Sequence, residues 1–172
     1  MGSIDKSQAL TLRWAEVAND PSLRDLPYKI EVNAWGKVEM SPASYRHGRL
    51  QGYIIAALSE QLQGGAALGE VPILTDIGVR VPDVAWASDA FMAAARDGSP
   101  LLSAPEVCIE MISASNSDAE LKEKTRAYLA AGAHEVWLVE EQGSIRYFDA
   151  LGEREVSGFS VQLSIPHAAK DQ

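Results

Sequence analysis

The sequence has little of the side chains that build disulfide scaffolds and zinc sites, with one cysteine and three histidines in 172 residues. The single cysteine, Cys108, has no partner for an internal disulfide, which excludes a disulfide framework. None of the histidines has metal-ligand spacing with another. Cys108 lies in an apolar run and is therefore expected in the core.

The sequence also lacks long apolar runs and an excess of positive charge. No segment is long enough to span a bilayer, and the N-terminus lacks the basic region and apolar core of a signal peptide. Fifteen Lys and Arg against 24 Asp and Glu give a formal net charge of −9. This balance argues against broad electrostatic binding to nucleic acid or to an anionic membrane, although a local basic surface is compatible with it. We expect a cytoplasmic protein that does not bind membranes.

What the sequence has is the composition of a globular protein, with 47% hydrophobic and 23% charged residues. Its length fits one domain with a proper core, and neither an internal repeat nor a linker divides it. We predict a single domain over residues 1–172, with an N-terminal helix at about 7–19 and a core at about 28–163.

The order of periodic segments predicts an α/β fold, with a central mixed β-sheet flanked by helices. Besides the N-terminal helix, helical patterns occupy about 44–63, 88–96 and 118–131. Strand patterns occupy 28–33, 37–40, 71–75, 78–87, 107–112, 135–140, 144–148 and, weakly, part of 153–163. The segment from Val136 to Phe148 is expected to form a hydrophobic sheet edge, which favours a homodimer.

Glu110 is the only charge in the apolar run from Val107 to Ile112. Such a run is typical of a strand buried on both faces, where a carboxylate is costly unless it is paired or binds a metal. A second acid, Asp83, follows Pro82 at the start of another apolar run with strand character. These two acids are therefore the first candidates for a chemical role.

A lysine is expected to join the two acids from the helix that follows. Lys124 shares a helical face with Leu121 and Tyr128, at spacings of three and four residues. Because the apolar members of that face must pack on the sheet, Lys124 is carried toward the sheet as well. Two carboxylates and a backbone carbonyl, such as that of Met111, suit Mg²⁺ or Mn²⁺. With an ammonium nearby, such a set would suffice for metal-assisted hydrolysis of a phosphodiester.

Short motifs follow one another from Tyr28 to Phe148 in an order and spacing that are more specific than any one of them. They are Pro82-Asp83; Glu110-Met111-Ile112-Ser113; Lys124 three residues before Ala127-Tyr128; the hairpin from Glu31 to Met40 with Trp35-Gly36 at its turn; Ser41-Pro42 followed by His47; and the segment from Ala130 to Val139. Together they resemble the Uma-two family of the PD-(D/E)XK restriction-endonuclease-like superfamily. The resemblance implies a restriction-endonuclease-like core, a divalent metal and endonuclease activity on DNA.

The resemblance also implies roles for single residues. It maps the metal-binding acids onto Asp83 and Glu110. The superfamily pattern places a lysine two residues after the glutamate, where this sequence has Ile112. In the family that lysine is moved onto the following helix, which gives Lys124.

Further positions implied by the resemblance lie in the early hairpin and in the helix after it. An acidic position falls on Glu31 or Glu39. The helix histidine falls on His47, which would contact a phosphate or position the substrate with the help of Arg49. The simpler alternatives are that both glutamates face solvent and that His47 is a surface or hydrogen-bonded residue.

The central three residues have simpler explanations too. Asp83 fits a turn cap, and Glu110 fits a structural ion pair with Lys124 or Arg126. Lys124 fits a solvated helix lysine held by Glu120 through an i,i+4 pair worth a few tenths of a kcal/mol. Three functions therefore stay open: a DNA endonuclease, a non-catalytic nucleic-acid or protein-binding module, and a metal-dependent hydrolase of another substrate.

Overall fold

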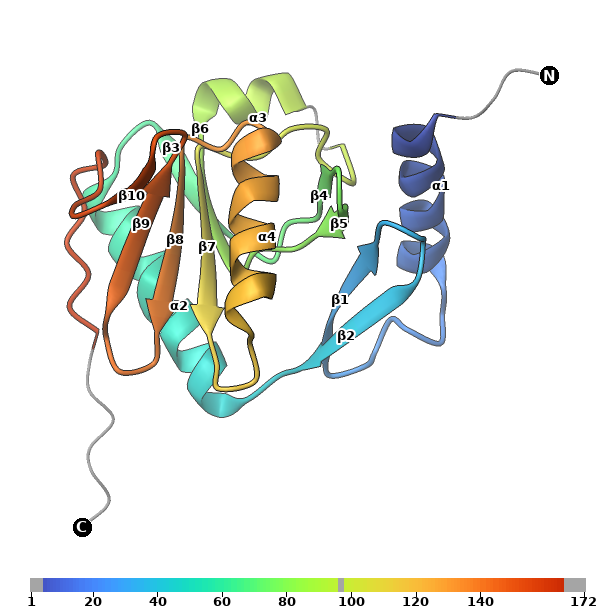
Figure 1. Cartoon of the computed structure of the whole chain (residues 1–172), viewed down its shortest axis with the longest axis horizontal. Coiled ribbons are helices and arrows are strands. Elements are labelled where there is room, and N and C mark those ends of the chain that lie inside the picture. Colours follow the sequence, from blue (N-terminus) through green and yellow to red (C-terminus); the bar gives the residue numbers. More distant parts are fainter. Residues whose placement is uncertain (1–4, 96–97, 166–172) are drawn as a thin grey trace, which may run out of the picture.

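The computed structural model describes residues 5–95 and 98–165, so the two ends of the predicted 1–172 domain lie outside it. The described chain forms four helices and two β-sheets (Figure 1). The helices are α1 (Lys6–Asn19), α2 (Tyr45–Gln61), α3 (Asp89–Ala95) and α4 (Asp118–Ala130). The smaller sheet has the order β2 (Val38–Pro42), β1 (Tyr28–Asn33), β5 (Gly78–Arg80), β4 (Ile73–Thr75). The larger sheet has the order β10 (Gly152–Arg154), β9 (Ile145–Asp149), β8 (Glu135–Glu140), β7 (Val107–Ile112), β6 (Val84–Ser88), β3 (Gly65–Gly69).

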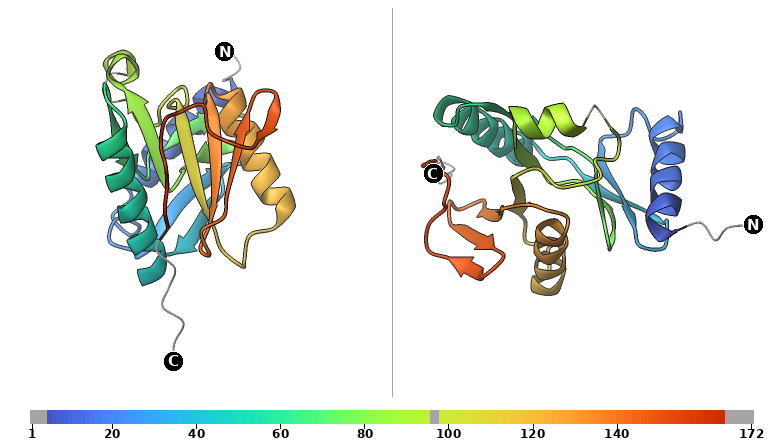
Figure 2. Two further views of the ribbon diagram at one scale, coloured as in Figure 1. Left: turned by 90° about the vertical axis from the view of Figure 1, so that its left-hand side faces the viewer. Right: turned by 90° about the horizontal axis from the view of Figure 1, so that it is seen from above.

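The larger sheet lies between α2 and α4, as the two views of Figure 2 show. β7 and β8 pair in parallel, and α4 forms the crossover between them. Because side chains alternate along a strand, Ile109 and Met111 of β7 pack in the same core cluster as α2, whereas Cys108 packs in the cluster that includes α4. The same alternation turns Glu110 toward α4.

The β1 strand of the smaller sheet packs against α1 on one face and against α4 and the larger sheet on the other. Ile30 and Val32 belong to the core cluster that β1 shares with α1. Lys29 and Glu31 alternate with them and face the opposite way, where Glu31 is buried. Two adjacent strands hold β1 in place, β2 by a five-residue antiparallel register and β5 beside Val32 and Asn33.

The predicted α/β architecture, with a central mixed β-sheet flanked by helices, is confirmed by the six-stranded sheet, but the second, smaller sheet was not predicted. The strand predicted at 78–87 is divided into β5 and β6, which belong to different sheets. Pro82 lies between them, and its missing N–H cannot continue a ladder. β3 was not predicted, since Gly64-Gly65 indicates a helix end. Gly65 pairs with Ser88 so closely that an added Cβ would lie 2.3 Å from the Ala87 carbonyl oxygen.

The predicted hydrophobic edge from Val136 to Phe148 was also wrong. β8 lies between β7 and β9, and Val136 is fully buried. The edges of the larger sheet are β10 and β3. The homodimer thus stays a prediction that has lost this support. In the described chain, no helix has the length and hydrophobicity of a membrane span.

Candidate active site

Asp83 and Glu110 lie side by side at one end of the β6–β7 pair. Val84 pairs with Ile109 in antiparallel register, so the residue before Val84 falls opposite the residue after Ile109. Directly opposite residues on such strands point to the same face. The Oδ2 atom of Asp83 accepts a hydrogen bond from the backbone N–H of Met111 at 2.7 Å. Both acids are buried, with exposed fractions of 1% for Asp83 and 4% for Glu110.

Lys29, which the sequence did not single out, joins the two acids. Its Nζ lies 2.7 Å from Oδ1 of Asp83 and 3.5 Å from Oε2 of Glu110. Lys29 comes from β1 of the smaller sheet, so this ammonium also links the two sheets. The only signal in the sequence was the strand alternation that places Lys29 and Glu31 on one face, and polar residues on alternate positions usually indicate solvent.

Lys124 reaches Glu110 from the opposite side. Its Nζ lies 3.0 Å from Oε2 of Glu31 and 3.5 Å from Oε1 of Glu110. Tyr128, one helical turn further along α4, donates a hydrogen bond from its hydroxyl to Oε1 of Glu110 at 2.7 Å. The helical face therefore turns inward as the sequence predicted, and Lys124 pairs with these buried acids instead of with Glu120. The donor role of Tyr128 was missed because the tyrosine was treated as an apolar member of that face.

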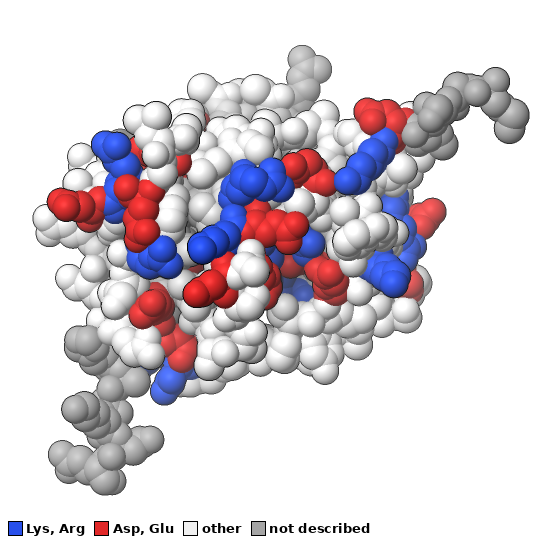
Figure 3. All heavy atoms as spheres, viewed as in Figure 1, with Lys and Arg blue, Asp and Glu red and all other residues white. Residues whose placement is uncertain are grey.

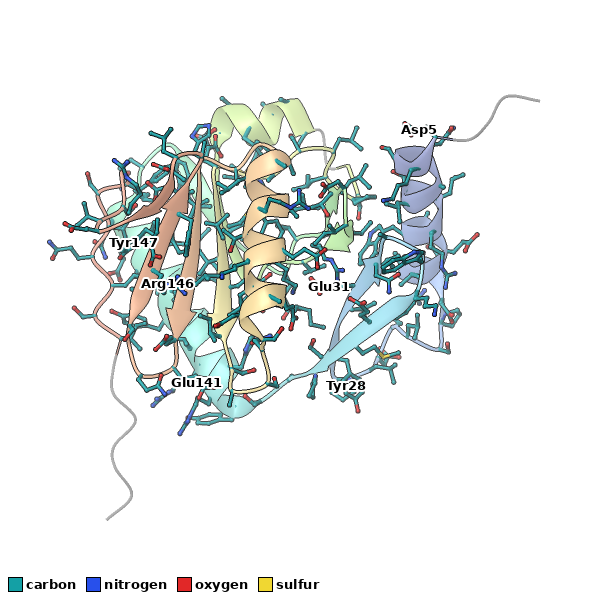
Figure 4. The ribbon with its side chains drawn as sticks, in the orientation of Figure 1. Asp5, Tyr28, Glu31, Glu141, Arg146 and Tyr147 are labelled. Carbon is teal, nitrogen blue, oxygen red and sulfur yellow. The ribbon has the colours of Figure 1, made fainter. Side chains whose placement is uncertain are left out.

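Arg80 contacts both acidic candidates of the hairpin, Glu31 and Glu39. The guanidinium lies 3.4 Å from Oε2 of Glu31 and forms a second ion pair with Glu39. Glu31 is buried and also accepts a hydrogen bond from the backbone N–H of Val81 at 2.8 Å. The Glu39 side chain is 46% exposed. Glu31 is thus the hairpin acid that joins the site, and it lies between α4 and the hairpin in Figure 4.

His47 lies at the solvent-exposed side of the same cluster. Ser44 caps α2 and accepts a hydrogen bond from the His47 backbone N–H at 3.1 Å, which fixes the first turn. The Nε2 atom of His47 lies 3.2 Å from Oδ1 of Asp83, and its side chain is 30% exposed. Arg49 is exposed and stands about 200° further round the helix. The structure brings His47 to the acids but not Arg49, whose substrate-binding role stays a prediction.

The charges in the cluster perturb one another strongly. Burial alone raises the pKa of Asp83, but the adjacent His47 and the Lys29 ammonium outweigh it and lower that pKa to about 2. Burial raises the pKa of Glu110, against the opposing effect of Lys29 and Lys124. The hydrogen bond with Asp83 raises the pKa of His47. Burial lowers the pKa of Lys29, yet Glu110 and Asp83 more than reverse this and raise it. Lys29 is therefore a charged ammonium at neutral pH.

Two oxygen atoms of the cluster are suited to a divalent metal. Oδ1 of Asp83 and Oε2 of Glu110 both face one cationic nitrogen, so they already converge on a single positive charge. Hard carboxylate oxygens are the donors that Mg²⁺ and Mn²⁺ prefer, with waters in the remaining positions. No group of three His, Cys, Asp or Glu side chains with metal-ligand geometry occurs in residues 5–95 and 98–165. A metal here would thus have two protein carboxylates.

The position two residues after the glutamate holds no cation. Ile112 is half-buried and packs against the core cluster that contains Leu121 of α4. Since residues two apart on a strand share a face, a lysine at this position would also have pointed toward α4. Lys124 instead brings an ammonium to Glu110 from the helix.

The fold and the paired acids define this chain as a member of the restriction-endonuclease-like α/β class. A crystal structure of "a putative nuclease belonging to DUF820" from Anabaena variabilis superposes with a TM-score of 0.59 at 19% identity, over 79% of this chain and 87% of that one. The structure of a DrdV–DNA complex matches with a TM-score of 0.41 at 12% identity, over 88% of this chain and 12% of that one.

The sequence identifies the family within that class. The family model Uma2, described as "Putative restriction endonuclease", matches residues 21–167. The chain therefore belongs to the Uma2 (Uma-two) family, as its motifs indicated. No curated protein matches the sequence.

Proposed function

We propose that this protein is a divalent-metal-dependent endonuclease that hydrolyses phosphodiester bonds in DNA. The observation that carries the proposal is the convergence of Asp83 and Glu110 on one cation, with Lys124 on the far side of the glutamate. Membership of a family described as "Putative restriction endonuclease" supports the same chemistry.

Asp83 and Glu110 would hold Mg²⁺ or Mn²⁺ through the two oxygens that face Lys29. When bound, such an ion lowers the pKa of a coordinated water and neutralises charge on a phosphate. The hydrogen bond from the Met111 N–H fixes the orientation of Asp83, and the Tyr128 hydroxyl does the same for Glu110. These contacts preorganise the acids, because neither carboxylate can rotate without losing a hydrogen bond.

Lys124 supplies a fixed positive charge beside the acids. Glu31 and Glu110 hold its ammonium, and Arg80 together with the Val81 N–H holds Glu31 in turn. A preorganised ammonium stabilises the negative charge that develops on a phosphoryl group or orients the attacking water. His47 is the half-exposed member of the cluster, and we assign it the contact with the incoming phosphate.

The described residues on the face shown in Figure 3 form no large basic surface that would attract DNA. There, acidic and basic side chains are interspersed over α4 and the β1–β2 hairpin. With a formal net charge of −9, binding has to depend on local contacts at the site. We therefore expect weak association with bulk DNA, and binding that falls only gradually with added salt because few phosphates are neutralised.

The test is nicking of supercoiled plasmid in Mg²⁺ or Mn²⁺ at low salt. The native protein should convert the plasmid to open circles, and EDTA should abolish this. Asp83→Asn and Glu110→Gln should be inactive, whereas Glu60→Gln, an exposed acid at the end of α2, should match the native protein. Equal activity in the native protein and both site variants would refute the proposal.

A second candidate is a binding module that retains the fold without the reaction. It is favoured by Ile112 at the usual lysine position and by the three cations, Lys29, Lys124 and Arg80, that already neutralise the buried acids. A thermal-shift titration with Mn²⁺ separates the two candidates, because a ligand that binds only the native state raises its melting temperature. If the protein is a binding module, Mn²⁺ should raise its melting temperature no more than it raises that of Glu110→Gln.

A further inference from the structure

Each acid of the site has one oxygen that is held by a hydrogen bond from β7 or α4 and one oxygen that faces Lys29; that oxygen of Asp83 also contacts His47. Oδ2 of Asp83 accepts the Met111 N–H, and Oε1 of Glu110 accepts the Tyr128 hydroxyl and faces Lys124. The remaining oxygens, Oδ1 and Oε2, both face the Nζ of Lys29. The Lys29 ammonium thus lies where a metal ion bound by these two carboxylates would lie.

Lys29 and a divalent ion cannot hold this position together. The proposed function assigns the same two oxygens to the metal, and this inference rests on that assignment. An ammonium within contact of both oxygens would lie within a few ångströms of the ion, where like charges repel strongly in a buried site. Metal binding therefore requires that the ammonium leaves.

The lysine side chain can leave without a change in the fold. Lys29 is near the start of β1, next to the 44% exposed Tyr28, and its own side chain is 12% exposed. A lysine carries a compact charge on a flexible four-carbon stem, so rotation of the side chain alone moves the charge by several ångströms. The Lys29 side chain would move out toward His47, because His47 contacts the same Oδ1 atom of Asp83 and is the half-exposed member of the cluster.

We propose that Lys29 is a tethered counter-ion, which occupies the metal position in the metal-free protein and moves to the phosphate of the substrate when a divalent ion takes that position. Two consequences follow. The ammonium competes with the metal, so it weakens metal binding in the absence of DNA. Once displaced, it is a point-charge ligand for phosphate, so metal and DNA each strengthen the binding of the other.

The first experiment measures Mn²⁺ binding by calorimetry and thermal shift, without DNA. Lys29→Met removes the charge at nearly constant length, and Lys29→Gln keeps a donor for Asp83 in case the first variant folds poorly. In EDTA, both variants should melt at a lower temperature than the native protein. Both should also bind Mn²⁺ roughly tenfold more tightly than the native protein, because the competing cation is gone. Lys37→Met, an exposed lysine in the same hairpin, should change neither property.

The second experiment measures binding of a short DNA duplex by fluorescence anisotropy. With Ca²⁺ in place of Mn²⁺, Lys29→Met should bind the duplex roughly fivefold more weakly than the native protein, because a phosphate contact is lost. In EDTA the two proteins should bind equally, because the native ammonium is then held by the acids.

The results separate this inference from the proposed function. If both Lys29 variants bind Mn²⁺ no more tightly than the native protein, the counter-ion proposal is wrong, even when the native protein nicks DNA. If the variants bind Mn²⁺ more tightly and weaken DNA binding only with Ca²⁺, the proposal holds, even when no variant cleaves DNA.

Discussion

The Oδ2 atom of Asp83 accepts a hydrogen bond from the backbone N–H of Met111 at 2.7 Å. This bond ties the residue before β6 to β7, and it leaves the other oxygen to His47 and Lys29. Asparagine can keep the bond to Met111 with its carbonyl oxygen, but it then presents an NH₂ group to two donors. Asp83 is thus a residue whose charge can be removed while its backbone contact is kept.

Asp83 should make the protein sensitive to acid. Its pKa is lowered from 3.8 to about 2, so the stabilisation is present above pH 3.8 and is lost as the pH falls through about 2. The shift corresponds to on the order of 2 kcal/mol. The unfolding free energies of the native protein and Asp83→Asn, measured by urea denaturation, should therefore converge with falling pH. Asp25→Asn, an exposed control, should follow the native protein at every pH, and a constant gap for Asp83→Asn would contradict the assignment.

Lys124→Met should separate catalysis from metal binding. Lys124 contacts Oε1 of Glu110 and Glu31, not the two oxygens that face Lys29. We expect plasmid nicking to fall by about a hundredfold, as when one preorganised electrostatic contact is removed. The Mn²⁺-dependent rise in melting temperature should remain. Lys122→Met, which alters an exposed neighbour on α4, provides the control; unchanged nicking by Lys124→Met would rule out a catalytic role for that ammonium.

The His47 imidazole should stay protonated above its ordinary range. The hydrogen bond with Asp83 raises the pKa of His47 from 6.5. Its contribution to stability is therefore complete below pH 6.5 and is lost as the pH rises through the folded-state pKa. NMR titration of the imidazole should give a pKa above 6.5, and Asp83→Asn should bring it down. A pKa that does not respond to Asp83→Asn would mean that the two side chains do not interact in solution.

Gly78→Ala should destabilise the protein and disturb the site through β1. Gly78 has φ +125, and an added Cβ would lie 2.0 Å from the Val32 carbonyl oxygen. Because that atom belongs to the backbone, relief requires β1 to move, and we expect a loss of about 2 kcal/mol or more in thermal or urea unfolding. Gly52→Ala on α2, where nothing lies within 4 Å, should be neutral or slightly stabilising. Equal stability of the two variants would show that β5 and β1 are not closely packed.

The central acids and Lys124 were predictable because their signals are local. Glu110 is a single charge in a buried strand, and the helical face of Lys124 is fixed by Leu121 and Tyr128. Strand alternation and helical periodicity then dictate which way each side chain points. The structure brings Asp83, Glu110 and Lys124 together in this way, while their catalytic roles stay predictions.

Lys29 was missed because its position depends on how the two sheets pack, and Arg80 because its partners lie on other strands of the smaller sheet. Alternating polar residues in β1 predicted a solvent face, but that face is covered by α4 and by the acids of the larger sheet. No local pattern encodes these contacts, since the partners of Lys29 lie 54 and 81 residues away in the sequence and those of Arg80 lie 49 and 41 residues away. Glu31 is buried for a related reason: Arg80 and the Val81 N–H reach it within the smaller sheet, and Lys124 reaches it from α4 only after the sheets have packed.

Because the smaller sheet contributes Lys29 and Glu31 while Asp83 and Glu110 belong to the larger one, neither half holds the whole constellation. Lys29 and Glu31 therefore reach Asp83, Glu110 and Lys124 only when the two sheets have packed together. The network of buried charges is thus complete only in the fully folded chain.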